Sequence, residues 1–129
     1  MSEKNLYKTF ERNWPSYIKR IEPGNIGEGI PDCHLVNKKK HDIFLELKFL
    51  PKKFINKKLH IRQSQIIWFI EYKGKFAFIL FKVDKIYYLF DKSKIFTISR
   101  KILWSLFEAE ALIKTEKIQT IIEHLESCQ

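Results

Sequence analysis

The stretch GIPDCHLV-NKKKH-DIFLELK, residues 29–48, contains two short runs with β-strand patterning on either side of a polar, lysine-rich loop. Because successive side chains of a strand point to opposite faces of a sheet, the leucines and isoleucine of the second run share one face. Glu46 and Lys48 point to the other face. A carboxylate and an ammonium group in the middle of an apolar strand indicate a site rather than a purely structural segment.

The two runs predict an antiparallel hairpin whose register can be stated in advance. If residues 37–41 form its loop, Val36 faces Asp42. The same register places Asp32 opposite Glu46 on one face, with about 5 Å between their Cβ atoms. A slip of one residue would put the two acids on opposite faces. The sequence therefore predicts that two carboxylates converge.

A divalent cation would resolve the repulsion within such a pair. Like charges held close together raise one pKa and oppose folding unless a cation neutralises them. Mg²⁺ accepts carboxylate oxygens and keeps several waters, which suits a site that also binds a substrate phosphate. Lys48, two residues from Glu46 on the same face, can orient a water or stabilise charge on the phosphate. These residue types favour metal-dependent phosphodiester hydrolysis.

The same residues carry a resemblance to a known superfamily. P-D at residues 31–32, followed by E-x-K at residues 46–48, resembles the PD-(D/E)xK motif of restriction-endonuclease-like proteins. Three further features resemble the VRR-NUC and Holliday-junction-resolvase-like nucleases encoded by phages, namely G-x-P-D at residues 29–32, a hydrophobic-E-L-K run at residues 45–48, and the downstream Gln65 and Trp68. The similarity covers roughly residues 1–82, and the short P-D and E-x-K pieces alone are weakly specific.

The resemblance implies an Mg²⁺-dependent endonuclease, with Mn²⁺ as a substitute, that cuts branched DNA. Four-way junctions cut by a homodimer in the cytoplasm of a phage-infected host are the first expectation. A less selective flap or nicking DNase, or a non-catalytic DNA-binding or anti-defence module on the same fold, are the alternatives. Asp32 and Glu46 would bind metal, Lys48 would assist the attacking water, and Gln65 would reach back to the site, with Gln63 as its competitor.

A third acid is also implied by the resemblance. Related resolvases complete the metal site with a glutamate of the N-terminal helix, and Glu3 is the best match, with Glu11 as the alternative. Glu22, near the following glycine-rich loop, is a third candidate. A simpler role for Glu3 is to interact with the positive end of its own helix.

Basic residues lie on both sides of the proposed site along the chain. The formal net charge is +9, and a polyanionic partner such as DNA fits this charge, although ribosomal and membrane-surface proteins are also basic. The candidate phosphate contacts are Lys38, Lys39, Lys40, Lys52, Lys53, Lys57, Lys58 and Arg62. Such contacts make binding salt-dependent without giving sequence preference.

Composition and missing motifs exclude other classes. The 129 residues suffice for one domain, and the two cysteines, Cys33 and Cys128, predict no disulfide framework and a reduced, cytoplasmic setting. The apolar runs are too short for a membrane span, and no secretory signal is visible. Scattered histidines argue against zinc, and the absence of G-K-[ST] after the glycines at residues 24–29 argues against a nucleotide cofactor.

The predicted architecture is α/β, a restriction-endonuclease-like fold with a mixed central sheet of about five strands flanked by helices. The single domain, residues 1–129, has a core over about residues 1–92 and C-terminal helices over about residues 99–126. The expected elements before the hairpin of 76–90 are a helix capped by Ser2 and ending before Pro15, a strand over residues 17–22, a strand that includes Asp32 and ends at Val36, a strand over 42–49 and a helix over 60–73. They are followed by strands over 76–83 and 85–90 that form this hairpin, an edge strand over 95–98, a helix from Ser99 to Leu112 and a last helix over 115–125.

Overall fold

The computed structural model describes residues 3–21, 29–50, 61–100 and 103–129. Its elements follow in the order α1 (Glu3–Asn13), β1 (Ile18–Arg20), β2 (Cys33–Val36), β3 (Asp42–Leu50), α2 (Gln63–Glu71), β4 (Phe76–Val83), β5 (Ile86–Asp91), the 3₁₀ turn η2 (Lys92–Lys94), α3 (Ile95–Ile98), α4 (Trp104–Glu110), β6 (Ile113–Thr115) and α5 (Ile118–Ser127). The expected order of helix, three strands, helix and hairpin is therefore confirmed.

Within the described residues, six strands form one mixed sheet in the order β1-β2-β3-β4-β5-β6. All neighbouring pairs are antiparallel except β3 and β4, which run parallel. Parallel neighbours need a crossover connection, and α2 supplies it. The predicted α/β class with a mixed sheet and flanking helices is confirmed, and the expected count of about five strands is low by one.

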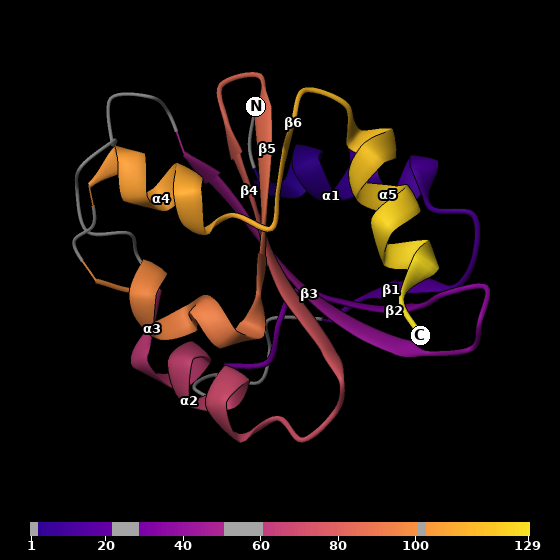
Figure 1. Cartoon of the computed structure of the whole chain (residues 1–129). Helices are drawn as coiled ribbons and strands as arrows, with labels where there is room; N and C mark the ends of the chain where they lie inside the picture. Colours follow the sequence, from indigo (N-terminus) through magenta and orange to yellow (C-terminus); the bar gives the residue numbers. More distant parts are fainter. Residues whose placement is uncertain (1–2, 22–28, 51–60, 101–102) are drawn as a thin grey trace.

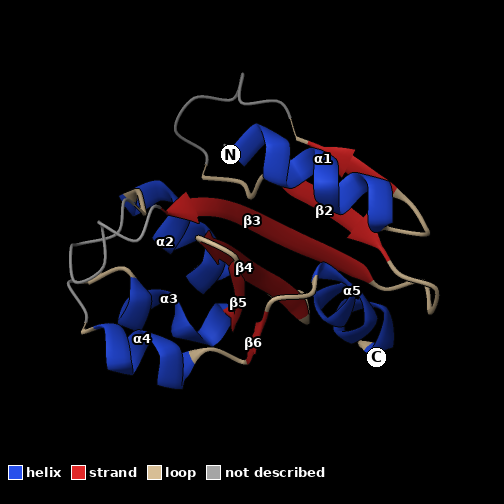
Figure 2. Cartoon of the chain, turned by 90° about the horizontal axis from the view of Figure 1, so that it is seen from above, coloured by secondary structure: helices blue, strands red, loops and turns tan. Residues whose placement is uncertain are grey.

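Helices cover both faces of the sheet. Figures 1 and 2 show α1 and α5 on one side, and α2, α3 and α4 on the other. The apolar side chains of β3 that were expected to share a face, among them Ile43 and Leu45, pack under α1 and α5. The opposite face of β3, which carries Glu46 and Lys48, belongs to the side of α2. The candidate site therefore lies on the side of the sheet opposite α1.

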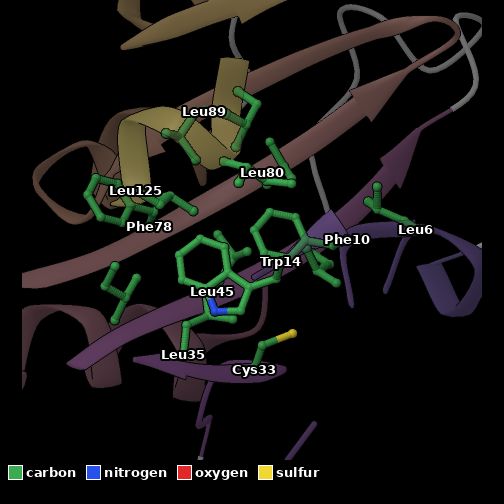
Figure 3. Packing of buried hydrophobic residues seen from close by; sticks show 14 of the residues in the cluster. Leu6, Phe10, Trp14, Cys33, Leu35, Leu45, Phe78, Leu80, Leu89 and Leu125 are labelled. Atoms are coloured by element: carbon green, nitrogen blue, oxygen red, sulfur yellow. The ribbon is translucent and has the colours of Figure 1, made fainter. Parts of the chain in front are cut away.

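The core beneath α1 follows from helical spacing in the sequence. Leu6 and Phe10 are four residues apart and both are fully buried, and Trp14, just beyond the helix, stacks on Phe10 with 5.7 Å between ring centroids. Figure 3 shows these side chains above Leu45 and Leu35 of the neighbouring strands. This apolar packing fixes the position of β2 and β3, which carry the candidate site.

The expected edge strand over residues 95–98 is wrong, because this segment is the short helix α3. Ile95 and Ile98 are both buried whereas Phe96 is exposed, a three-residue spacing that fits a helix face and not a strand. The turn before it starts at Asp91, whose Oδ2 accepts a hydrogen bond from the backbone N–H of Ser93 at 2.9 Å. This Asx-type cap directs the chain into helical geometry.

The C-terminal part contains the expected last helix, which is α5, but the long helix expected over residues 99–112 is wrong. Ser99 does not cap the next helix: it follows α3, and its backbone N–H donates to the carbonyl of Ile95. The α4 helix begins only at Trp104, and the chain after it pairs with β5 as β6, with Ile113 facing Leu89. Three residues are too few for a recognisable period-two pattern.

The tip of the β2–β3 hairpin is fixed to the C-terminal helix by one buried asparagine. The Asn37 amide donates to the carbonyl oxygens of Leu125 at 3.1 Å and Cys128 at 2.9 Å. Its Oδ1 accepts the backbone N–H groups of Lys39 and His41.

In the described part of the chain, no helix has the length and apolar character needed to cross a bilayer.

Candidate active site

The predicted hairpin register is the observed one. Val36 faces Asp42 and Cys33 faces Leu45, so the next pair outward is Asp32 and Glu46. The backbone N–H of Asp32 donates to Oε1 of Glu46 at 3.1 Å. Asp32 Oδ2 in turn accepts the backbone N–H that follows Glu46 in the strand, at 2.9 Å. The two acids are therefore brought together, as expected.

Lys48 and Gln65 complete a four-residue cluster around the Glu46 carboxylate. Lys48 Nζ lies 3.3 Å from Glu46 Oε2, and Gln65 Nε2 donates to the same oxygen at 2.6 Å. Gln65 Oε1 accepts the backbone N–H of Arg62, so one end of its amide is fixed at the start of α2 and the other at Glu46. Its competitor Gln63 is exposed. The cluster of Asp32, Glu46, Lys48 and Gln65 is called the acid–lysine site below.

A glycine holds the chain before Asp32 against α2. Gly29 has φ +69°, a left-handed conformation that L side chains rarely adopt. A Cβ atom at this position would lie 2.1 Å from the carbonyl oxygen of Ser64 and 2.7 Å from the backbone nitrogen of Gln65. The chain before Asp32 therefore approaches the first turn of α2 closely at Gly29. Gly24 and Gly27 lie outside the described residues.

Burial and charge make the Glu46 carboxylate unusual. Glu46 is only 4% exposed. Burial, and next the neighbouring carboxylate of Asp32, raise the pKa of Glu46 to about 7, although Lys48 acts in the opposite direction. A buried carboxylate with a strongly raised pKa and a second acid beside it is a common feature of functional sites. The raised pKa means that the Lys48 ammonium offsets the effects of burial and of the Asp32 charge on Glu46 only in part.

The donor set fits a hard divalent cation. Asp32 and Glu46 offer carboxylate oxygens, the ligand type that Mg²⁺ and Mn²⁺ prefer, and neither sulfur nor imidazole belongs to the cluster. These two residues would hold the ion. In residues 3–21, 29–50, 61–100 and 103–129, no three His, Cys, Asp or Glu side chains are grouped so that they could hold a metal among themselves.

Two of the three candidate third acids, Glu3 and Glu11, are not part of the cluster. Glu3 is exposed at the start of α1, which packs on the other face of the sheet. Glu11 is also exposed on α1, where its Oε2 accepts a hydrogen bond from the Tyr7 hydroxyl at 3.1 Å. Glu22 lies outside the described residues. A role for any of them as a metal ligand stays a prediction.

The candidate phosphate-binding residues are distributed over several places. Lys38, Lys39 and Lys40 are exposed at the hairpin tip, beyond the last pair of the ladder, Val36 and Asp42, which is itself four residues and about 13 Å along the strands from Asp32 and Glu46. Arg62 is exposed at the start of α2, next to Gln65. Lys52, Lys53, Lys57 and Lys58 lie outside the described residues.

Sequence reasoning missed a group of rings next to the acid–lysine site. His34 lies on the same face as Asp32, two residues further along β2, and its Nε2 is 2.8 Å from Asp42 Oδ1. The His34 ring stacks on Phe44 at 5.0 Å and meets Tyr17 edge-on at 5.7 Å. The period-two pattern that placed Asp32 and Glu46 together could also have placed His34 beside Phe44.

Comparison with known proteins adds no family assignment. No known family model matches the chain, and no curated protein matches it significantly. The arguments that follow therefore rest on the geometry and chemistry of the acid–lysine site.

Proposed function

We propose that this chain is a metal-dependent endonuclease of the PD-(D/E)xK type that hydrolyses phosphodiester bonds in branched DNA. The observation that carries the proposal is the convergence of Asp32, Lys48 and Gln65 on the carboxylate of Glu46, each within hydrogen-bonding or ion-pair distance of it. These residues come from three separate elements, the loop before β2, the middle of β3 and the first turn of α2. Core packing alone gives no reason for their meeting.

The fold belongs to the same proposal. A restriction-endonuclease-like arrangement is supported by the order of one helix, three strands, a crossover helix and a hairpin, with β3 and β4 parallel. A homodimer that acts in the cytoplasm of a phage-infected host is the accompanying expectation. The formal net charge of +9 fits a polyanionic substrate.

The residues of the site divide the chemical work. Mg²⁺ or Mn²⁺, when bound, would supply Lewis-acid polarisation of the phosphate and a more acidic water. Asp32 and Glu46 would hold the ion through their carboxylate oxygens. Lys48 can orient the attacking water and stabilise the charge that develops on the phosphate. Gln65 keeps the Glu46 carboxylate in one orientation, because its own amide is fixed at the start of α2.

A cleavage assay with matched variants tests this function. The wild type is expected to cut a four-way junction in the presence of Mg²⁺ or Mn²⁺. Asp32→Ala and Lys48→Ala are expected to lose at least about 100-fold in rate, as is usual when charge-stabilising groups are removed, while they still bind the junction. Lys85→Ala, which changes an exposed lysine in the β4–β5 turn, should cut like the wild type and controls for contaminating nucleases.

The substrate is tested in the same experiment. A linear duplex with the sequence of one junction arm pair should be cut much more slowly than the junction. Equal cutting of both would replace junction resolution by a less selective flap or nicking activity. The endonuclease proposal fails if the wild type cuts no DNA with either metal and if Glu46→Ala binds DNA as well as the wild type does. The chain would then be a non-catalytic DNA-binding module.

A further inference from the structure

The surface next to the acid–lysine site carries aromatic side chains that reach solvent. In the register of β1, β2 and β3, Lys19 faces His34, and His34 faces Phe44. Tyr17, two residues before Lys19, points to the same side and meets the His34 ring. Tyr17 is 51% exposed, Lys19 is exposed, and the His34 side chain keeps 28% of its surface accessible. We call Tyr17, Lys19 and His34 the ring surface.

This surface is continuous with the acid–lysine site. Asp32 and His34 lie on the same face of the chain, two residues apart, which corresponds to about 7 Å. Phe44 and Glu46 repeat this spacing on β3. Two base steps along one strand of B-form DNA also cover about 7 Å. A strand whose phosphate lies at Glu46 would therefore bring its neighbouring nucleotides over the ring surface.

The His34 ring is held by neighbouring rings of β3 and α2. Phe44 packs against Trp68 and Tyr72 of α2, with centroid distances of 5.2 Å and 5.3 Å. His34 stacks on Phe44 at an interplanar angle of 23° and is held from its edge by Asp42. These rings run from Trp68 and Tyr72 on α2, which are partly buried, to Tyr17, which is exposed. Rings held in this way lose little freedom when a base stacks on them.

We propose that the ring surface binds a single nucleic-acid strand that adjoins the phosphodiester at the acid–lysine site. Tyr17 and His34 stack on unpaired bases, and Lys19 contacts a phosphate of the same strand. Stacking on aromatic rings tolerates any base sequence, and a nearby lysine adds the salt-dependent part of the affinity. Paired bases hide their faces in the duplex, so the surface selects branched DNA whose branch point has, or opens to give, unpaired nucleotides next to the cut. The inference rests on the proposed function and specifies its substrate.

Binding experiments without cleavage test the ring surface on its own. The protein is titrated, with EDTA present, into a short labelled single strand and into a duplex of the same length. Tyr17→Ala is expected to bind the single strand about five- to a hundredfold more weakly, the range measured for the loss of one stacked base, and to bind the duplex like the wild type. Tyr17→Phe keeps the ring and should bind both like the wild type. Phe96→Ala, which removes an exposed ring of α3, is the matched control.

A fluorescent base analogue reports stacking directly. A strand with 2-aminopurine in place of one adenine is expected to lose fluorescence on binding to the wild type and to Tyr17→Phe, but much less on saturation of Tyr17→Ala. The Tyr17 substitution leaves the fold intact, because only the Tyr17 backbone carbonyl is hydrogen-bonded, to the N–H of Val36 and the indole of Trp14. Thermal unfolding of each variant verifies this point.

The outcomes separate this inference from the proposed function. If Tyr17→Ala binds and quenches like the wild type, or weakens single strand and duplex equally, the ring surface is not a stacking site, whether or not the protein cuts DNA. If Tyr17→Ala loses single-strand binding but the wild type cuts nothing with Mg²⁺ or Mn²⁺, the ring surface stands and the endonuclease proposal fails.

Discussion

The side-chain amide of Gln65 connects the first turn of α2 to the carboxylate of Glu46 in β3. One end donates to Glu46 Oε2 at 2.6 Å, and the other accepts the backbone N–H of Arg62 at 3.0 Å. Gln65 is buried, so water cannot easily replace either bond. Gln65 thus couples the start of α2 to the Glu46 carboxylate. A change at one of them should alter the position of the other.

Replacing Gln65 should reduce stability as well as activity. Gln65→Ala leaves a buried carboxylate oxygen and a backbone N–H without this partner, which costs about 1–3 kcal/mol of unfolding free energy. Gln63→Ala, on the exposed side of the same turn, should change stability by less than about 0.5 kcal/mol. Urea unfolding of the two variants beside the wild type measures the difference. Equal stability of both variants would contradict a structural role for the Gln65 amide.

The raised pKa of Glu46 predicts how the metal-free protein responds to pH. A folded pKa of about 7, above the ordinary 4.5, means that the folded state binds a proton that the unfolded state releases. The contribution of Glu46 is therefore fully present below about pH 4.5 and is lost as pH rises to about 7. It amounts to about 2–3 kcal/mol. Stability in EDTA should fall over this window, and Glu46→Gln should flatten the fall. If the unfolding free energy of Glu46→Gln falls with pH as steeply as that of the wild type, a group other than Glu46 titrates.

Addition of a divalent cation should reverse that loss. At pH 8 and at ten to a hundred times its Kd, Mg²⁺ or Mn²⁺ should stabilise the wild type by about 1–3 kcal/mol, seen as a rise of several degrees in Tm. Asp32→Ala and Glu46→Gln should show no rise at the same concentration. Ca²⁺ and EDTA samples serve as controls. A full Tm shift in both variants would mean that the ion binds outside the acid–lysine site.

Gly29 should be the least replaceable glycine among the described residues. Gly29→Ala combines a left-handed φ of +69° with a contact to the Ser64 carbonyl that has to be relieved. The φ alone costs about 1–2 kcal/mol. Gly74→Ala meets only the movable end of the Tyr72 side chain and should be milder. Thermal unfolding ranks the two variants, and a milder Gly29→Ala would show that the loop before Asp32 can move away from α2.

The Asn37 contact predicts a large effect far from the site. Asn37→Ala removes two hydrogen bonds that hold the hairpin tip to the end of α5 and two that shape the tip itself, and it should lower stability by about 2–3 kcal/mol. Asn13→Ala, which removes one exposed bond to the Thr9 carbonyl, should be close to neutral. Hydrogen exchange of α5 provides an independent measurement: its amides should lose protection in Asn37→Ala only.

The part of the fold that could be predicted is the part in which a period repeats. Two alternating runs around a polar loop determined the register of β2 and β3, and therefore the meeting of Asp32 with Glu46. Gln65 was expected to reach the site only because of a family resemblance. Its hydrogen bond to Glu46 could not be derived from spacing, since it depends on how α2 is placed over the sheet by Gly29 and the apolar core.

The segments that were predicted incorrectly are short and lack such repetition. Ile95 to Ile98 contains β-branched residues, but the cap at Asp91 and the burial of Ile95 with Ile98 favour one helical turn. Residues 113–115 form a strand because β5 offers an open edge, and this tertiary cause leaves no local pattern. The Asp42–His34 pair was also missed. It lies between two strands, so it becomes visible only when the predicted register of the hairpin is applied to both of them.

Both margins of the sheet end in strands of three residues, β1 and β6. Each margin therefore offers few backbone groups to a neighbouring chain, which discourages fibre-like stacking of one molecule onto the next. A homodimer of this protein would have to be built mainly by side chains rather than by a sheet continuing across the two-fold axis. The distance between its two acid–lysine sites would then be set by helices and loops. These parts can change in sequence and length without disturbing the strands that position Asp32 and Glu46.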